Sequence, residues 1–129
     1  MPLVKVWIHF VWSTKNRFPY LTDNIRTQVF DHIYTNARSK GILLDTIGGY
    51  VDHMHTLVLL RNNQTISRTV QLMKGESSFW VNKNKLTEET FEWQNDYYVE
   101  SVDEARLNTL RKYITNQEDH HRPKSSGGV

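Results

Sequence analysis

The chain of 129 residues contains no cysteine, so it can form no disulfide and has no thiolate for catalysis or metal binding. It also has no uninterrupted apolar run of about 18 residues, the length that a membrane-spanning helix needs. The first residues, Met1 to Lys5, lack the apolar stretch of a signal peptide. These absences predict a cytoplasmic protein with no membrane partner.

An excess of one charge is also missing. The formal net charge is +2 and the basic residues are scattered, so charge alone does not indicate a nucleic-acid binder. Hydrophobic residues make up 38% of the chain and aromatic residues 12%, which is typical of a globular protein. The length suits one domain with one core. We expect a single domain at residues 1–122, followed by a polar, glycine-rich and disordered tail at residues 123–129.

The spacing of apolar residues predicts four strands and three helices. Strands are expected at residues 4–14, 42–47, 53–60 and 91–99, and helices at residues 22–41, 66–83 and 101–121. Gly48-Gly49 favours an antiparallel hairpin between the second and third strands. Ser101 and Glu104 have the spacing of a capping box at the start of the third helix.

This order of elements is β-α-β-β-α-β-α. It predicts an α+β fold with a ferredoxin-like, or RRM-like, antiparallel sheet whose one face is covered by the first two helices. The third helix is additional to that unit. We expect it to cover the opposite face of the sheet.

Two histidines, His53 and His55, open the third strand. Side chains alternate between the faces of a strand, so both imidazoles point the same way, while Met54, Val58 and Leu60 point the other way. Two imidazoles on one face form a partial metal site that needs a third ligand. The alternative is that both histidines simply lie on a half-buried sheet surface.

Tyr113 and Gln117 are four residues apart, so they share one face of the expected third helix. A tyrosine beside a bound cation is a suitable nucleophile toward phosphorus, because the metal polarises a phosphoryl oxygen. The amide oxygen of Gln117 is a candidate third ligand. The alternatives are a core tyrosine packed beside Leu110 and a solvated glutamine.

Four stretches of the chain together resemble one protein family. Residues 51–58 resemble the His-hydrophobic-His motif of the HUH endonucleases, and residues 111–121 resemble the tyrosine helix of the single-tyrosine (Y1) transposases of the IS200/IS605 group. Residues 9–17 and 72–78 resemble the first strand and the second helix of that family. The stretches occur in the family's order.

The resemblance implies that His53, His55 and Gln117 bind a divalent metal ion and that Tyr113 cuts single-stranded DNA. Cleavage would leave a 5′-phosphotyrosine and a free 3′-hydroxyl, so strand joining needs no nucleotide cofactor. REP-associated relatives have Asn-Pro where this chain has Gln117-Glu118, which places the chain nearer the IS200 type. The resemblance also implies Mg²⁺ or Mn²⁺ as the metal, although two imidazoles alone would favour softer ions.

The expected partners are single-stranded DNA with subterminal hairpins and a second copy of the chain. The aromatic face of residues 91–99 suggests a homodimer joined partly through sheet edges. Trp12 and Tyr98 are candidates for stacking on bases. Candidate phosphate contacts are the basic residues near the motifs: Lys15, Arg17, Lys74, Arg111 and Lys112.

Two other functions are compatible with these patterns. One is a non-catalytic single-stranded nucleic-acid binding module, because a ferredoxin-like sheet with exposed aromatic residues can bind by stacking alone. The other is a domesticated, REP-associated-type tyrosine nuclease with the same chemistry. Covalent attachment to DNA separates the binding module from the enzymes.

Overall fold

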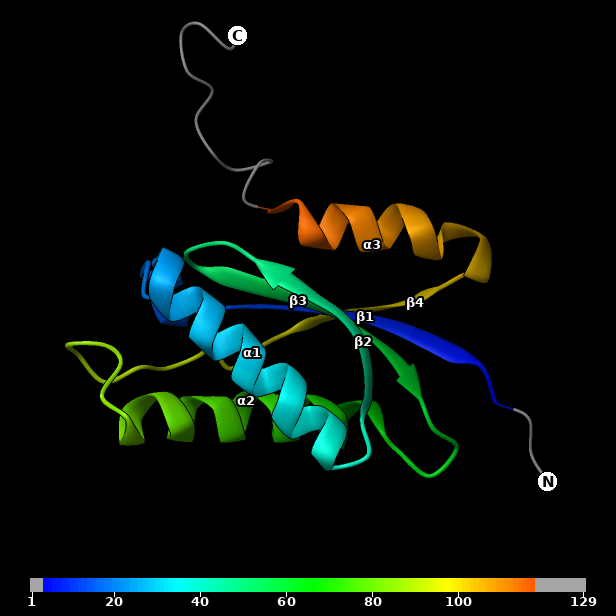
Figure 1. Cartoon of the computed structure of the whole chain (residues 1–129). Coiled ribbons are helices and arrows are strands. Elements are labelled where there is room, and N and C mark those ends of the chain that lie inside the picture. Colours follow the sequence, from blue (N-terminus) through cyan, green and yellow to red (C-terminus); the bar gives the residue numbers. More distant parts are fainter. Residues whose placement is uncertain (1–3, 118–129) are drawn as a thin grey trace, which may run out of the picture.

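The computed structural model describes residues 4–117 and contains a four-stranded antiparallel sheet with the strand order β2-β3-β1-β4 (Figure 1). The elements in chain order are β1 (Val6–Ser13), α1 (Asp23–Ser39), β2 (Leu43–Gly49), β3 (His53–Leu60), α2 (Ile66–Lys83), β4 (Tyr98–Val102) and α3 (Leu107–Thr115). Short 3-10 turns lie at Lys15–Arg17 and Glu104–Arg106.

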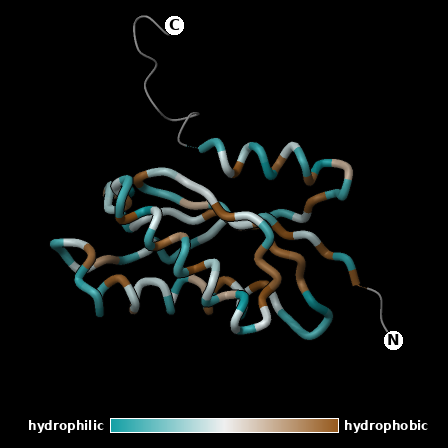
Figure 2. Tube along the Cα trace, in the orientation of Figure 1, coloured by the Kyte–Doolittle hydropathy of each residue, from teal (hydrophilic) through white to brown (hydrophobic). Residues whose placement is uncertain are grey.

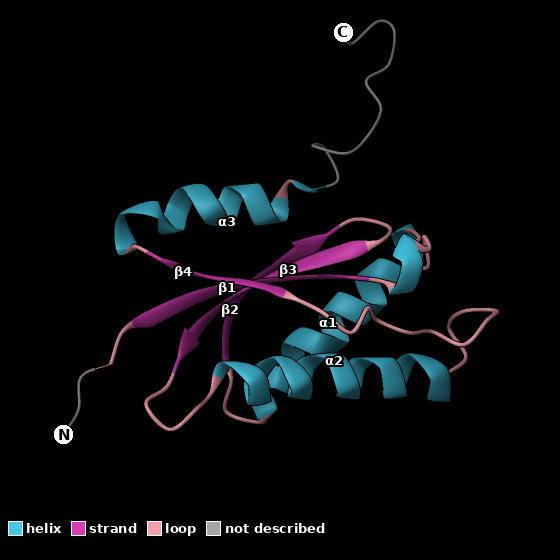
Figure 3. Ribbon diagram, turned by 180° about the vertical axis from the view of Figure 1, so that it is seen from behind, coloured by secondary structure: helices cyan, strands magenta, loops and turns pink. Residues whose placement is uncertain are grey.

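The predicted α+β, ferredoxin-like arrangement is confirmed. Helices α1 and α2 cover one face of the sheet and α3 lies across the other, as the views from the front and from behind both show (Figures 1 and 3). The hairpin between β2 and β3 is also present, with Gly49 opposite Met54. Within residues 4–117, no helix is both long enough and apolar enough to cross a membrane.

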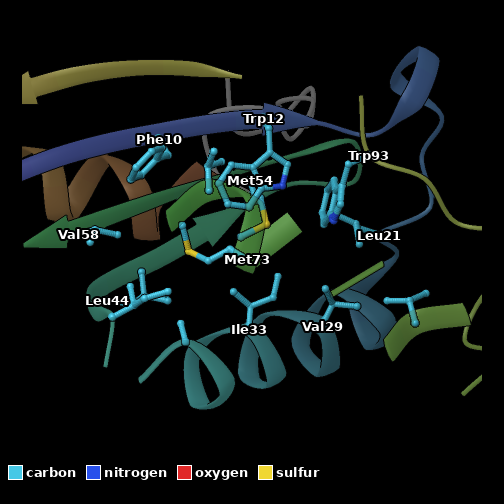
Figure 4. Close-up of a cluster of buried hydrophobic side chains, with 14 of the residues drawn as sticks. Phe10, Trp12, Leu21, Val29, Ile33, Leu44, Met54, Val58, Met73 and Trp93 are labelled. Carbon is cyan, nitrogen blue, oxygen red and sulfur yellow. The ribbon is translucent and has the colours of Figure 1, made fainter. Parts of the chain in front are cut away.

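The main core lies between the sheet and helices α1 and α2. Every second residue of β1 and β3 points into it, and α1 contributes a stripe at helical spacing. In Figure 2, hydrophobic positions recur along the strands and on the two helices between hydrophilic ones. Figure 4 shows these side chains meeting: Phe10, Trp12, Met54 and Val58 from the sheet, and Val29, Ile33 and Met73 from the helices.

A second, smaller cluster joins α3 to the opposite face of the sheet. It consists of Leu57, Val102, Leu107, Leu110 and Ile114. Because Leu57 has the same strand parity as His53 and His55, the two histidines also face α3. The residues of β3 from His53 to Val58 are all buried, since both faces of this strand are covered.

The predicted fourth strand was wrong in position. Residues 91–97 are irregular apart from one bridge between Thr14 and Trp93, and β4 begins at Tyr98. The alternating aromatic residues serve a different purpose: Phe91 and Trp93 enter the main core, where the indole N–H of Trp93 donates to Ser77 Oγ at 2.9 Å. The aromatic residues of this segment therefore anchor it to α2 and the core, and their spacing only resembles that of a strand.

The predicted capping box was also wrong. Ser101 belongs to β4 and pairs with Ile8, so it cannot cap a helix. A 3-10 turn follows, and α3 starts at Leu107. The predicted extension of this helix to His121 and the predicted disordered tail lie outside the described residues.

Candidate active site

The two histidines of β3 lie under α3, with their side chains almost fully buried. His53 is 6% exposed and His55 is 5% exposed, and their ring centroids are 5.2 Å apart. Their placement follows from strand parity, since Met54 between them points into the main core. The prediction that both imidazoles share a face is confirmed.

Helix α3 brings Tyr113 and Gln117 to the same place. The Tyr113 ring is perpendicular to the His55 ring at a centroid distance of 5.6 Å. Gln117 Oε1 lies 3.0 Å from His53 Nε2, while the Gln117 amide nitrogen donates to the backbone carbonyl of Tyr113 at 2.9 Å. The sheet and α3 therefore bring together all four residues that the sequence singled out, across 64 positions of chain between His53 and Gln117.

The exposure of Tyr113 and the burial of Gln117 contradict the two alternatives, a core tyrosine and a solvated glutamine. Tyr113 is 43% exposed, so it is not a core tyrosine, and Gln117 is 1% exposed, so it is not a solvated helix residue. The hydrogen bond from the Gln117 amide nitrogen to the Tyr113 carbonyl restrains the orientation of this buried amide. An exposed phenol beside buried imidazoles is accessible to a substrate.

Asp52 and His9 contact the two histidines and Glu100 contacts His9, and the sequence interpretation gave these three residues no role. Asp52 Oδ1 accepts from His53 Nδ1 at 2.9 Å. His9 Nε2 lies 2.9 Å from His55 Nδ1, and His9 Nδ1 donates to Glu100 Oε2 at 3.0 Å. One signal was present in the sequence: His9 alternates with Ile8 and Phe10 along β1, so its side chain lies on the opposite face of the sheet from theirs.

The two carboxylates at the outer ends of these contacts are kept ionised. Burial raises the pKa of Asp52, but the hydrogen bond from His53 and the charge of Arg17 outweigh it and lower that pKa. The hydrogen bond from His9 is the largest influence on Glu100 and lowers its pKa. An ionised carboxylate only accepts hydrogen bonds, so Nδ1 of His53 and Nδ1 of His9 each carry a proton.

The site fits a metal ion in its donor chemistry. With Nδ1 protonated, a neutral His53 turns the lone pair of Nε2 toward Gln117 Oε1, which is also an acceptor, across 3.0 Å. An imidazole nitrogen and an amide oxygen are both atom types that bind divalent cations. Within residues 4–117, no group of three His, Cys, Asp or Glu side chains is arranged to hold a metal ion.

Two cavities open on either side of Tyr113. The larger, about 490 Å³, is lined by His53, Gln117 and Arg17 together with the segment before β4. The smaller, about 390 Å³, is lined by His9, Glu100 and Arg106. Val11, His55, Tyr98 and Tyr113 line both. Because they share these lining residues, the two cavities adjoin each other under α3.

The five basic candidates for DNA contact have different surroundings. Arg17 lines the larger cavity and donates to Asp52 at 3.2 Å. Lys15 pairs with Glu92, and Arg111 donates to both carboxylate oxygens of Asp45 at 2.9 and 3.1 Å. The Lys74 ammonium donates to the carbonyls of residues 94, 95 and 96 at 2.5, 3.0 and 3.3 Å. Lys112 is exposed on α3.

The two aromatic candidates for base stacking also differ. Trp12 is 2% exposed and packs edge to face against Trp93 in the main core, so the proposal that it stacks on bases was wrong. Tyr98 is 57% exposed and lines both cavities. Only Tyr98 of this pair is available to a ligand.

Known proteins are similar to this chain over most of its length. The sequence model of the family described as "Transposase IS200 like" matches residues 3–117. The ISDra2 transposase TnpA of Deinococcus radiodurans is 27% identical over 116 residues, which are 86% of this chain and 83% of that protein. The crystal structure of a putative transposase from Deinococcus radiodurans is 25% identical with a TM-score of 0.70, over 90% of this chain and 93% of that one.

A further solved structure, of a REP-associated tyrosine transposase bound to a REP hairpin, has a TM-score of 0.68. Its sequence is 16% identical, and the match covers 95% of this chain and 72% of that one. At this identity the similarity concerns the fold.

Proposed function

This chain belongs to the family of IS200-like transposases, and from that premise we propose that it cuts and rejoins single-stranded DNA with Tyr113 as the nucleophile. The observation that carries the proposal is the position of Tyr113. Its phenol is exposed, borders both cavities and lies beside His55. A nucleophile needs both access to the substrate and a group that activates it.

The chemistry follows from a phenol acting on a phosphodiester. The Tyr113 oxygen loses its proton and bonds to phosphorus, the bond from phosphorus to the 3′-oxygen breaks, and the released oxygen takes up a proton as a 3′-hydroxyl. Tyr113 then carries the 5′-phosphate. Attack by a second 3′-hydroxyl reverses these steps and joins two strands, so the reaction consumes no nucleotide cofactor.

We propose that His53, His55 and Gln117 hold a divalent metal ion. When bound, the ion supplies a positive charge that polarises a phosphoryl oxygen. We propose Mg²⁺ or Mn²⁺ because the amide oxygen of Gln117, together with DNA phosphate and water oxygens, would supply the oxygen ligands that these ions prefer.

We propose that the single strand runs through both cavities, with the scissile phosphate at Tyr113. Tyr98 lines both and offers an exposed ring for base stacking, while Arg17 and Arg106 offer one cation on each side. The REP-associated transposase of similar fold is described as bound to a REP hairpin, which supports hairpin-containing DNA as the substrate.

We further propose that the protein acts as a homodimer joined partly through a sheet edge. Strands β2 and β4 are the two edges of the sheet, and an uncovered edge offers backbone groups for pairing with another copy. Exchange of two strands also needs two nucleophiles, and each chain offers one Tyr113. A monomeric mass by light scattering at micromolar concentration contradicts this part of the proposal.

The test of the nucleophile uses Tyr113→Phe, which removes one oxygen and keeps the ring. Labelled single-stranded DNA carrying the element's end is incubated with protein and Mn²⁺ and run on a denaturing gel. Wild type should yield protein-linked label and Tyr113→Phe none, whereas Tyr97→Phe, at a partly exposed tyrosine of the larger cavity, should keep it. Label on the Tyr113→Phe protein rules Tyr113 out.

A non-catalytic binding module is the second candidate, favoured by the exposed ring of Tyr98. It predicts retention of DNA by the wild type under native conditions and no label after denaturation. A domesticated nuclease gives the same gel as the transposase, and imperfect palindromes flanking the gene separate these two.

A further inference from the structure

We propose that His9 is a positioning residue that, with Glu100, fixes the tautomer and the orientation of His55. The inference rests on the proposed metal site, because it assigns His9 the task of preparing one of the metal's ligands. It extends the site from His53, His55, Tyr113 and Gln117 to two further strands of the sheet, β1 and β4.

The geometry of the chain of contacts is set by the sheet register. His9 and Glu100 are direct cross-strand partners of β1 and β4, and His9 Nδ1 lies 3.0 Å from Glu100 Oε2. His55 is a diagonal neighbour of His9 on β3, and the two rings lie nearly parallel, 16° apart, with His9 Nε2 at 2.9 Å from His55 Nδ1. His9 is 4% exposed, so water has little access to this contact.

The direction of each hydrogen bond follows from the carboxylate end. A carboxylate can only accept hydrogen bonds, so the contact between Glu100 Oε2 and His9 Nδ1 puts the His9 proton on Nδ1. His9 Nε2 then accepts in the hydrogen bond with His55, which requires a proton on His55 Nδ1. The lone pair of His55 is therefore on Nε2, the nitrogen that can bind a metal.

The same result is reached on His53 by a shorter route. There the carboxylate of Asp52 accepts directly from Nδ1, which leaves the lone pair on Nε2. Metal-bound histidines commonly donate their second N–H to a carboxylate or carbonyl, which fixes the ring and raises its basicity. His55 differs in that an imidazole stands between it and its carboxylate.

A merely structural role for His9 would be to fill space between β1 and α3. Such a role does not depend on which nitrogen of His55 carries the proton. The tautomer of His55 in the metal-free protein therefore separates the two roles, and it can be read from the ¹⁵N chemical shifts of the histidine rings.

The test compares His9→Leu with His9→Gln in the full chain. Leucine fills the space but makes no hydrogen bond, whereas the glutamine amide can donate to Glu100 and accept from His55. His9→Leu should give a mixture of His55 tautomers and a Mn²⁺ affinity lower by about 10- to 100-fold. His9→Gln should restore the Nδ1–H form of His55 and recover most of the affinity, measured by titration calorimetry.

The control is His32→Leu, which removes another histidine hydrogen-bonded to a glutamate, at 2.7 Å from Glu76 between α1 and α2. It should change neither the His55 tautomer nor the Mn²⁺ affinity. If His9→Leu does not fold, Glu100→Ala replaces it, since the Glu100 side chain is 31% exposed and its loss frees His9 to take the other tautomer.

An unchanged His55 tautomer in His9→Leu, or in Glu100→Ala, overturns the proposal, because the tautomer then does not depend on the contact between His9 and His55. This readout is taken without metal. If the wild type binds no Mn²⁺ but the His55 tautomer still changes in His9→Leu, only the proposed metal site is contradicted. Failure of the metal site and failure of the role of His9 are therefore distinguishable.

Discussion

The backbone carbonyl of Ile114 lies directly over Gly48. A Cβ placed on residue 48 would come 2.1 Å from that oxygen and 2.8 Å from its carbon, which no real side chain tolerates. Glycine at this position in β2 therefore lets α3 approach the sheet closely. Ile114 follows Tyr113, so this close approach also sets the height of the tyrosine above His55.

We expect Gly48→Ala to push α3 away from the sheet, because the obstacle is backbone and cannot turn aside. The free energy of unfolding should fall by about 1–3 kcal/mol, and Mn²⁺ affinity should fall with it.

Gly75→Ala is the control: no atom lies within 4 Å of a Cβ at this helical position, so stability should rise by up to about 1 kcal/mol. Urea denaturation measures both. Equal stability of Gly48→Ala and wild type would mean that α3 is not pinned here.

The histidine pair gives a second prediction. His53→Ala and His55→Ala should each weaken Mn²⁺ binding and DNA cleavage strongly while the circular dichroism spectrum stays that of the wild type. The reason is that each removes one of the two imidazoles from the proposed metal site. His32→Ala, on the other face of the sheet, should retain both activities. Wild-type cleavage by either variant would exclude this metal site.

The ion pair between Arg111 and Asp45 predicts a pH dependence of stability. Burial raises the pKa of Asp45, but hydrogen bonds from Arg111 and Thr46 and the charges of Arg111 and Arg38 lower it below its ordinary 3.8. A lowered folded-state pKa stabilises the protein above the ordinary value, and this contribution is lost as the pH falls through the lowered value.

Wild type should therefore be more stable than Asp45→Asn at pH 7, by less than about 1 kcal/mol because the pair is partly solvated. The difference should shrink as the pH falls below 3.8 and should vanish once the pH is below the lowered pKa of Asp45. Thermal unfolding of the two proteins across pH 2–7 measures it. A constant difference over that range would show that the charge of Asp45 plays no part.

Two lysines near the site should respond differently to salt. Lys112→Gln removes an exposed cation from α3, so the slope of log affinity for single-stranded DNA against log salt should fall by about one unit if Lys112 contacts a phosphate. Lys74→Gln removes an ammonium that already binds the carbonyls of residues 94, 95 and 96, so it should leave the slope unchanged and lower stability. Fluorescence anisotropy at several salt concentrations tests both, and the reverse pattern would reassign the phosphate contact to Lys74.

The parts of the fold that the sequence predicted are those where one periodicity dominates. The strand from His53 and the helix from Ile66 alternate or repeat without competing signals, and both begin within a residue of the expected position. The alternation of side chains along the strand then placed His53 and His55 on the face opposite to that of Met54. The arrival of Gln117 at His53 needed the family resemblance, because no local pattern indicates which residue closes a contact across 64 positions.

The segment before α3 was mispredicted because its aromatic residues belong to the tertiary structure. Trp93 is held by Ser77 of α2, and no alternation within residues 91–99 encodes that contact. The role of His9 was missed for a related reason. Its partner Glu100 belongs to a strand that had been placed too early, so the cross-strand pair of His9 and Glu100 could not be predicted.

The contacts of the site join residues that are far apart in the chain. His9 is hydrogen-bonded to Glu100 across 91 positions and to His55 across 46, and Gln117 Oε1 lies against His53 Nε2 across 64. Such non-local contacts form late in folding, since the intervening loops must first close. A nascent chain still lacking α3 therefore has His53 and His55 without Tyr113 and Gln117, so the four residues come together only after nearly the whole domain has been synthesised.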